Sequence, residues 1–119
     1  MKRRFRLTSS ADFQCVRQQG KSYAHPLLVL VALPNQAERI RCGVAAGRSV
    51  GKAVQRNRAK RLLRSAIGPH LPALAPGWDI ILIARHPILK ATFGQTQAAL
   101  LTLLQKARLL QEINDLRLQ

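Results

Sequence analysis

The feature that most constrains the fold is a long cationic segment, residues 48–64, in which apolar residues recur at helical spacing. At 100° per residue, the apolar residues that follow Gln55 gather on one side of a helix: Ala59, Leu62, Leu63, Ala66 and Ile67. A helix with such a stripe has to bury it against another layer. We therefore expect a helix over residues 49–67, ended by Gly68-Pro69 and docked rigidly on a sheet.

The other side of this helix would carry the charge. Asn57, Arg58, Lys60, Arg61 and Arg64 lie opposite the apolar stripe, and Arg56 falls at its flank. An array held in this way suits RNA or DNA, because arginine clamps phosphate oxygens in two places and lysine acts as a point charge. With the other two cations of the segment, the candidate binding residues are Arg48, Lys52, Arg56, Asn57, Arg58, Lys60, Arg61 and Arg64.

Patterns on either side of this helix predict the rest of the domain. Ser9 and Asp12 form a capping signature for a helix over residues 10–19. Strand-like segments span residues 27–33 and 39–46, and the turn at 35–38 predicts that they pair as an antiparallel hairpin. The proline-rich stretch 68–77 is expected to be a loop, and residues 78–85 a buried strand. A last amphipathic helix would follow Thr92, with its apolar face formed by Leu100, Leu103, Leu104, Ala107 and Leu110.

The charge balance of the chain narrows its partners to polyanions. Twenty Lys and Arg stand against five Asp and Glu, which gives a net charge of +15. Nucleic acid is the first interpretation, and a membrane surface or an acidic protein is the second. A merely solvated helix would interleave glutamates with its cations, yet no acid lies between Glu38 and Asp79. A membrane-bound helix would need bulky aromatic residues on its apolar face, and a helix-turn-helix would need a helix where strands are expected.

Residues that could carry catalysis or hold a metal are sparse. The five acids are scattered along the chain, so we do not expect the protein itself to hold catalytic metal ions. Cys15 and Cys42 lack metal-binding spacing and are expected to be buried and reduced. No secretory signal is evident, and no apolar run is long enough to span a bilayer, so a cytoplasmic location is expected. The scattered acids are Asp12, Glu38, Asp79, Glu112 and Asp115, and three isolated histidines are His25, His70 and His86.

Residues 51–64 closely resemble the "RNR" signature of the bacterial ribonuclease P protein family, Gly-x-Ala-Val-x-Arg-Asn-Arg-x-Lys-Arg-x-x-Arg. Asp12-Phe13, Gly43-Val44 and residues 79–85 also fit the family's pattern, so the resemblance covers nearly the whole chain. It implies a single RNA-binding domain over residues 1–119, with a basic arm at 1–7 and a frayed tail at 112–119. The implied fold is an α/β sandwich of order αβββαβα, with a small mixed sheet and a left-handed βαβ crossover.

The resemblance also implies a function. The partner would be ribonuclease P RNA, one protein to one RNA, and that RNA would remove the 5′ leader of precursor tRNA with Mg²⁺ that it holds mostly itself. The signature residues that would meet the catalytic RNA are Arg56, Asn57, Arg58, Lys60, Arg61 and Arg64. A cleft between the first helix and the sheet would hold the leader, where Phe13 either stacks on a base or simply packs in the core.

This chain departs from the family's cleft at two places. Arg17 stands where many members have a second aromatic residue, and the strand 27–33 has no aromatic residue at all. Leader recognition would then depend more on charge, unless Tyr23 supplies the missing ring. Two other classes stay open: a structural RNA-binding protein, such as a ribosomal protein of similar fold, and a nuclease that acts without RNA.

Overall fold

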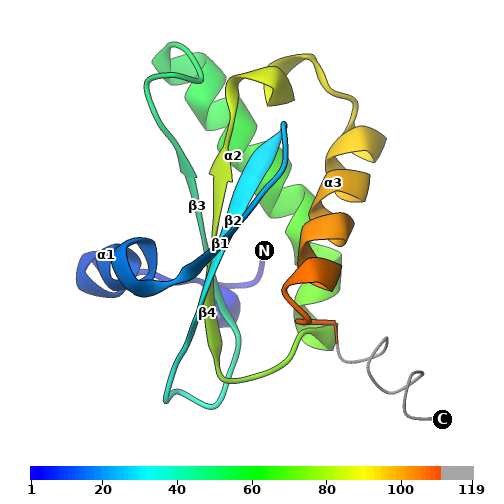
Figure 1. Ribbon diagram of the computed structural model, residues 1–119. Helices are drawn as coiled ribbons and strands as arrows, with labels where there is room; N and C mark the ends of the chain where they lie inside the picture. Colours follow the sequence, from blue (N-terminus) through cyan, green and yellow to red (C-terminus); the bar gives the residue numbers. More distant parts are fainter. Residues whose placement is uncertain (111–119) are drawn as a thin grey trace, which may run out of the picture.

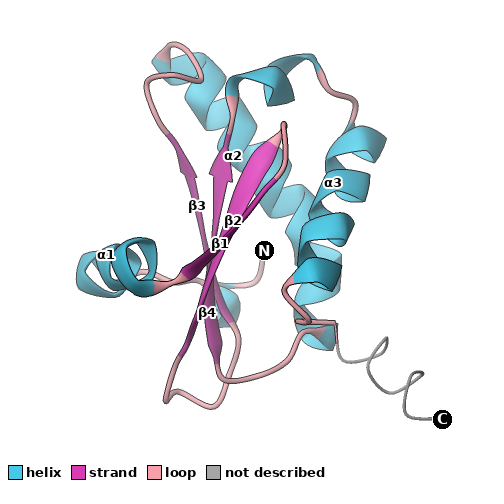
Figure 2. Cartoon of the chain, viewed as in Figure 1, coloured by secondary structure: helices cyan, strands magenta, loops and turns pink. Residues whose placement is uncertain are grey.

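The structure, a computed structural model that describes residues 1–110, has a four-stranded sheet with helices on both faces. Figure 1 shows α1 on one side of the sheet and α2 and α3 together on the other, and Figure 2 shows the same arrangement by secondary structure. The helices are α1 (Ser10–Gln19), α2 (Ala53–Ile67) and α3 (Phe93–Lys106). The strands are β1 (Lys21–Ala24), β2 (Leu28–Pro34), β3 (Arg41–Ala46) and β4 (Trp78–Ala84), and the 3-10 helices are η1 (Arg3–Phe5), η2 (Gly68–Ala73) and η3 (His86–Lys90).

The strand order is β1-β2-β4-β3, which confirms the small mixed sheet and the element order αβββαβα. The pairs β1–β2 and β2–β4 are antiparallel, whereas β3 runs parallel to β4. The connection from β3 through α2 to β4 is the expected left-handed βαβ crossover.

The expected hairpin between residues 27–33 and 39–46 is wrong, because β4 lies between β2 and β3. Two strands buried on both faces, β2 and β4, occupy the centre, where Leu30, Ile81 and Leu82 are all buried. The more polar β1 and the small-residue strand β3 take the edges. The residue pattern had also passed over β1, whose four residues are mostly exposed.

Alternate residues of the central strands feed two cores of different size. Leu28, Leu30 and Leu82 point to α2 and α3, where most of the buried apolar residues gather. Val31 and Ile81 point to the opposite face and pack against α1 through Val16, together with Leu7 from the N-terminal segment. The core on the α1 side of the sheet is therefore the smaller of the two, and α1 covers only part of that face.

The strands differ from the expected ranges by one or two residues at their ends, and larger differences lie at α2, at the expected loop and at α3. Helix α2 begins at Ala53 rather than at residue 49, because Gly51 has a φ of 150°, which does not continue into a helix. The stretch expected to be a loop begins with η2. Helix α3 ends at Lys106, so Leu110 is not on it; Leu110 instead forms an antiparallel bridge with Leu74.

The N-terminal segment 1–7 lies against the sheet. After η1, Arg6 forms a parallel bridge with Cys42, and the backbone N–H of Leu7 donates to the carbonyl of Cys42 at 2.9 Å. This segment therefore covers the outer edge of β3. The expected tail at 112–119 lies outside the described residues.

Candidate nucleic-acid interface

Helix α2 is docked by the apolar stripe that the sequence predicted. Ala59, Leu63, Ala66 and Ile67 are buried, and Leu62 is half-buried. At its start, the side-chain oxygen of Gln55 accepts a hydrogen bond from the backbone N–H of Lys52 at 2.8 Å. The helix is thus fixed both along its length and at its first turn, which holds the residues on its other side in a set arrangement.

The candidate binding residues form two rows on α2. The outer row, Asn57, Arg58 and Arg61, is exposed. The inner row, Arg56, Lys60 and Arg64, is half-buried along the flank of the apolar stripe. The sequence had put only Arg56 at this flank; Lys60 and Arg64 join it because residues four apart on a helix lie above one another. Arg48 and Lys52, which precede the helix, are both exposed.

Within residues 1–110, none of these cations forms an ion pair, and none of the eight side chains makes a hydrogen bond. The Nε atom of Arg56 is buried, and no hydrogen-bond partner for it lies among those residues. Like charges that find no partner among residues 1–110 repel one another, so this arrangement favours a polyanionic partner.

The acids of the described chain lie elsewhere. Asp79, at the start of β4, is only 4% exposed and binds Arg41 through two hydrogen bonds of 2.7 Å. The amide of Asn35 donates to the same carboxylate at 2.6 Å. Arg41 also reaches Asp12 of α1 at 3.4 Å. The hydrogen bond to Asp79 raises the pKa of Arg41, although burial lowers it, so Arg41 is a structural cation rather than a free one.

Phe13 lies where α1 meets β3. Its ring passes over Gly43 so closely that a Cβ on Gly43 would stand 2.8 Å from its Cε2 atom. The ring forms one wall of a hollow of about 230 Å³, which wraps around the outer edge of β3. Residues that line this Phe13 hollow are Met1, Arg6, Leu7, Thr8, Phe13, Cys42, Gly43, Val44 and Arg64.

The Phe13 hollow joins the two predicted sites. Arg64 reaches it from α2, on one face of the sheet, and Phe13 from α1, on the other. Arg17 does not share this hollow; it lies one turn beyond Phe13 and is exposed. The positive charges of Arg6 and Arg64 stand at the hollow itself, so charge and one aromatic ring meet there.

Tyr23 does not replace the missing aromatic residues on the α1 face. It packs against the core on the α2–α3 side of the sheet, and the Nζ atom of Lys21 lies 5.5 Å from the centre of its ring. The half-buried apolar strand residues on the α1 face include Val29, Leu33 and Ile83, which are all aliphatic. The suggestion that Tyr23 compensates is therefore wrong.

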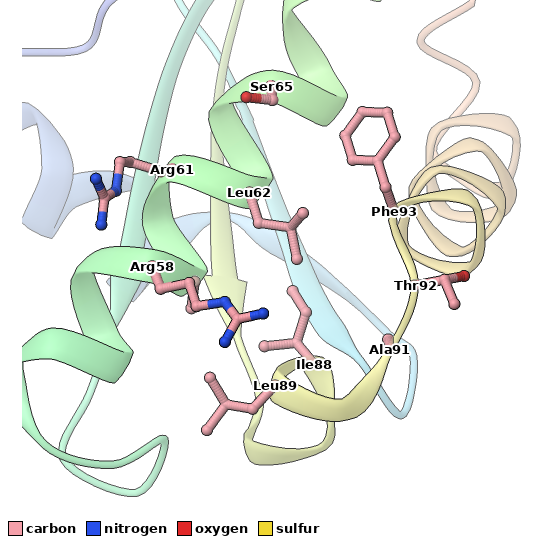
Figure 3. Close-up of a pocket in the computed structure, with 10 residues that line it drawn as sticks. Arg58, Arg61, Leu62, Ser65, Ile88, Leu89, Ala91, Thr92 and Phe93 are labelled. Atoms are coloured by element: carbon pink, nitrogen blue, oxygen red, sulfur yellow. The ribbon is translucent and has the colours of Figure 1, made fainter.

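One aromatic residue with an exposed side chain was not selected from the sequence. Phe93, the first residue of α3, is 44% exposed and lines a groove between α2, η3 and α3. Figure 3 shows this groove with Arg58, Leu62 and Leu89 on its walls. Phe93 lies seven residues before Leu100, so helical spacing puts it on the same face as the buried leucines and predicts burial. Its exposure follows from its place in the first turn of α3, which only the structure shows.

The described residues give little support for metal or thiol chemistry. No group of three or more His, Cys, Asp or Glu side chains within residues 1–110 is placed to hold a metal ion. Burial raises the pKa of the Cys42 thiol to about 12, which keeps it protonated and unreactive. Cys15 is only half-buried, less than expected. Within the same residues, no helix is both long and apolar enough to cross a membrane.

Comparison with known proteins places this geometry in one family. Residues 1–108 match the family model described as Ribonuclease P. The chain is 45% identical over 109 residues to the ribonuclease P protein component of Herpetosiphon aurantiacus, covering 92% of this chain and 89% of that protein. Against the same component of Dehalococcoides mccartyi, identity is 36% over 115 residues, with 97% and 94% covered.

Solved structures agree with the sequence comparison. The RNase P protein of Staphylococcus aureus superposes with a TM-score of 0.79 at 32% identity, covering 89% of this chain and 97% of that one. The RNase P protein of Thermotoga maritima gives a TM-score of 0.74 at 28% identity, with 85% and 96% covered.

Proposed function

Since this chain belongs to the ribonuclease P protein family, we propose that it binds the catalytic RNA of ribonuclease P and the 5′ leader of precursor tRNA, and so assists removal of the leader. The observation that carries this proposal is the docked helix α2. Its cations lack protein partners within residues 1–110, and its inner row ends at Arg64 in the Phe13 hollow.

The two surfaces would divide the work. The exposed outer row on α2 would bind phosphates of the RNA subunit, with Asn57 able to donate to and accept from a base edge or a ribose hydroxyl. The Phe13 hollow and Arg17 would receive the single-stranded leader, where Phe13 can stack on a base and the cations balance phosphate charge. Placed so, the protein holds the substrate against the RNA and leaves the chemistry to it.

The chemistry itself would belong to the RNA, with Mg²⁺ held mainly by RNA phosphates. In this protein, Asp79 is occupied by Arg41 and Asn35, and Asp12 lies 3.4 Å from Arg41. Two-metal hydrolysis needs several free carboxylates at one place, and these two are already engaged. The cations of α2 would lower the Mg²⁺ concentration that the RNA needs, because they screen the same phosphates. One protein would serve one RNA, in the cytoplasm.

The test is cleavage of a 5′-extended precursor tRNA at low Mg²⁺, with the protein alone, a bacterial ribonuclease P RNA alone, and both together. Cleavage at the mature 5′ end only in the combined sample is the expected result. Cleavage by the protein alone would instead identify a nuclease that needs no RNA. No stimulation with any of several bacterial RNA subunits, together with tight binding to ribosomal RNA, would favour a structural RNA-binding protein.

The outer row can be tested separately. Arg58→Ala and Arg61→Ala should each weaken binding of the RNA subunit by about 1–2 kcal/mol, the range of a charge-assisted hydrogen bond to phosphate. Filter binding at physiological salt measures this. Unchanged affinity in both variants would show that the outer row faces solvent in the complex.

A further inference from the structure

A groove on the α2–α3 side of the molecule, the Phe93 groove, is distinct from the Phe13 hollow. It has a volume of about 630 Å³, within the range of sites that enclose small ligands. Its floor and walls are mostly apolar, and its rim carries Arg58, Ser65 and Thr92. Residues that line it are Arg58, Ala59, Arg61, Leu62, Ser65, Ile88, Leu89, Ala91, Thr92 and Phe93.

Phe93 is the most exposed of the large apolar side chains of α3. Thr96, Ala99, Leu100, Leu103 and Leu104 of α3 are all buried, whereas Phe93 keeps 44% of its surface exposed. In Figure 3 its ring projects from the start of α3 across the groove toward α2, facing Leu62 and Ser65. A large aromatic ring left open beside a slot of this size is suited to stacking with a planar group.

The charges around the groove indicate which kind of planar group it would bind. Among residues 1–110, none of those that line the groove is acidic. Figure 3 shows the guanidinium of Arg58 directed into the groove toward Ile88 and Leu89, while Arg61 points to the other side of α2. The described acids are at the far end of the sheet, where β3 and β4 begin, and the groove is at the end where β4 finishes. A nucleotide meets these conditions, because its base is planar and apolar-faced and its phosphate is anionic.

We propose that the Phe93 groove takes one unstacked nucleotide of the ribonuclease P RNA, with its base on Phe93 and its phosphate at Arg58. Ser65 and Thr92 present hydroxyls at the rim for the base edge or the ribose. This inference rests on the proposed function and adds to it a base-binding contact on α3, beside the phosphate-binding cations of α2. The nucleotide belongs to the RNA subunit and not to the leader, because the Phe13 hollow and Arg17 lie toward the α1 face of the sheet.

The experiment measures the affinity of a bacterial ribonuclease P RNA for the full-length protein over a series of NaCl concentrations. Phe93→Ala and Phe93→Leu remove the aromatic plane, and Phe93→Trp keeps it. Leu101→Ala is the matched control, since Leu101 is also exposed on α3, at 37%, and does not line the groove. Urea unfolding of each variant verifies that it is folded.

We expect Phe93→Ala and Phe93→Leu to weaken binding about tenfold, the size of one lost base–aromatic stack. Phe93→Trp and Leu101→Ala should bind like the wild type. The slope of log affinity against log salt should stay unchanged in Phe93→Ala, because stacking releases no counterions. Arg58→Ala should lower that slope by about 0.7–0.9, the loss of one phosphate contact.

A second readout locates the nucleotide. Dimethyl sulfate and a carbodiimide modify unpaired bases of the RNA; one base should be protected by the wild type and by Phe93→Trp, and become reactive with Phe93→Ala. Arg61→Ala should leave that base protected at saturating protein. Equal affinity of Phe93→Ala and Leu101→Ala, without a change in protection, would overturn the inference while leaving the proposed function intact.

Two other outcomes would also decide the matter. A defect of Phe93→Ala seen only with precursor tRNA that carries a leader would assign the groove to the leader and overturn the choice of the RNA subunit. Failure of the wild type to bind the RNA subunit at all would overturn the proposed function, and this inference with it.

Discussion

At the scale of single residues, the ion-paired side chains around Asp79 lie apart from the cations of α2. Asp79 is buried and shared between Arg41 and Asn35, and Asp12 is held near the same arginine. A buried carboxylate is costly unless it is paired and hydrogen-bonded, which explains why two donors serve it. The network joins β3 to β4, and a longer contact of 3.4 Å from Arg41 reaches Asp12 of α1.

Replacing Arg41 by Ala should lower the free energy of unfolding by about 2 kcal/mol, because the buried Asp79 then keeps one side-chain donor within the described part of the chain, the Asn35 amide. The figure is below that of a fully buried pair, since the Arg41 side chain is 20% exposed. Urea unfolding measures it. Asp12→Asn is the control and should cost a few tenths of a kcal/mol at most, because its contact to Arg41 is long and its side chain is 43% exposed. Similar losses in both variants would contradict the central place of Asp79.

Arg17→Glu should weaken binding of leader-bearing precursor tRNA to the holoenzyme about fivefold and leave mature tRNA unaffected. Reversing an exposed charge removes one weak attraction and adds a similar repulsion, each below about 1 kcal/mol. Arg39→Glu, the same change at an exposed arginine between β2 and β3, is the matched control. An equal loss with mature tRNA would place Arg17 against the RNA subunit instead.

At the scale of elements, what the sequence predicted well was local. Helix α1 was predicted with its observed ends, since Ser9 caps it by accepting a hydrogen bond from the backbone N–H of Asp12. The apolar stripe of α2 was also right. Strand pairing was not, because it depends on which strand can be buried on both faces, a property of the whole sheet. Position 35–38 carries a turn signal, and the chain does turn there, but into a strand two places away.

The same limit applied to the candidate interface. The cations of α2 could be found from spacing alone, and so could Phe13 from its family pattern. The split of α2 into an outer and an inner row depends on what packs beside it, and the exposure of Phe93 depends on how α3 meets α2. Neither of these packing contacts can be predicted from the residues of one helix alone.

Gln55→Glu should stabilise the free protein and weaken the complex. The first turn of α2 contains no acid, so a carboxylate there should add about 0.5 kcal/mol through the helix dipole. It can still accept the hydrogen bond from the backbone N–H of Lys52.

The negative charge that Gln55→Glu adds beside the cations should lower affinity for the RNA subunit about threefold. Gln18→Glu, an exposed site on α1, makes the same charge change away from α2 and should leave that affinity nearly unchanged. A stability gain without any loss of affinity would place the start of α2 outside the interface.

At the scale of the whole molecule, the positive charge destabilises the free protein and stabilises its complex with RNA. A net charge of +15 on 119 residues repels itself in the free protein and is neutralised in a complex with RNA. The sheet and its two cores hold the cationic side of α2 in place despite this repulsion. Stability of the fold and affinity for RNA should therefore respond to salt in opposite directions.

Raising NaCl from about 0.05 to 0.2 M should increase the free energy of unfolding by several tenths of a kcal/mol, because salt screens the like charges. Over the same range, affinity for the RNA subunit should fall on the order of a thousandfold if about six phosphates are contacted. Urea is the denaturant for the first measurement, since guanidinium would itself screen the charges, and chloride avoids the exclusion effect of sulfate.

The variant Arg58→Ala tests the salt dependence of both stability and RNA affinity. If the outer row is the source of both effects, this variant should be slightly more stable than the wild type at low salt, and its RNA affinity should fall less steeply as salt rises. A protein whose stability did not change with salt, but whose RNA affinity did, would mean that the cations are far enough apart to be solvated independently. The binding surface would then be a set of separate contacts rather than a strained array that the RNA relieves.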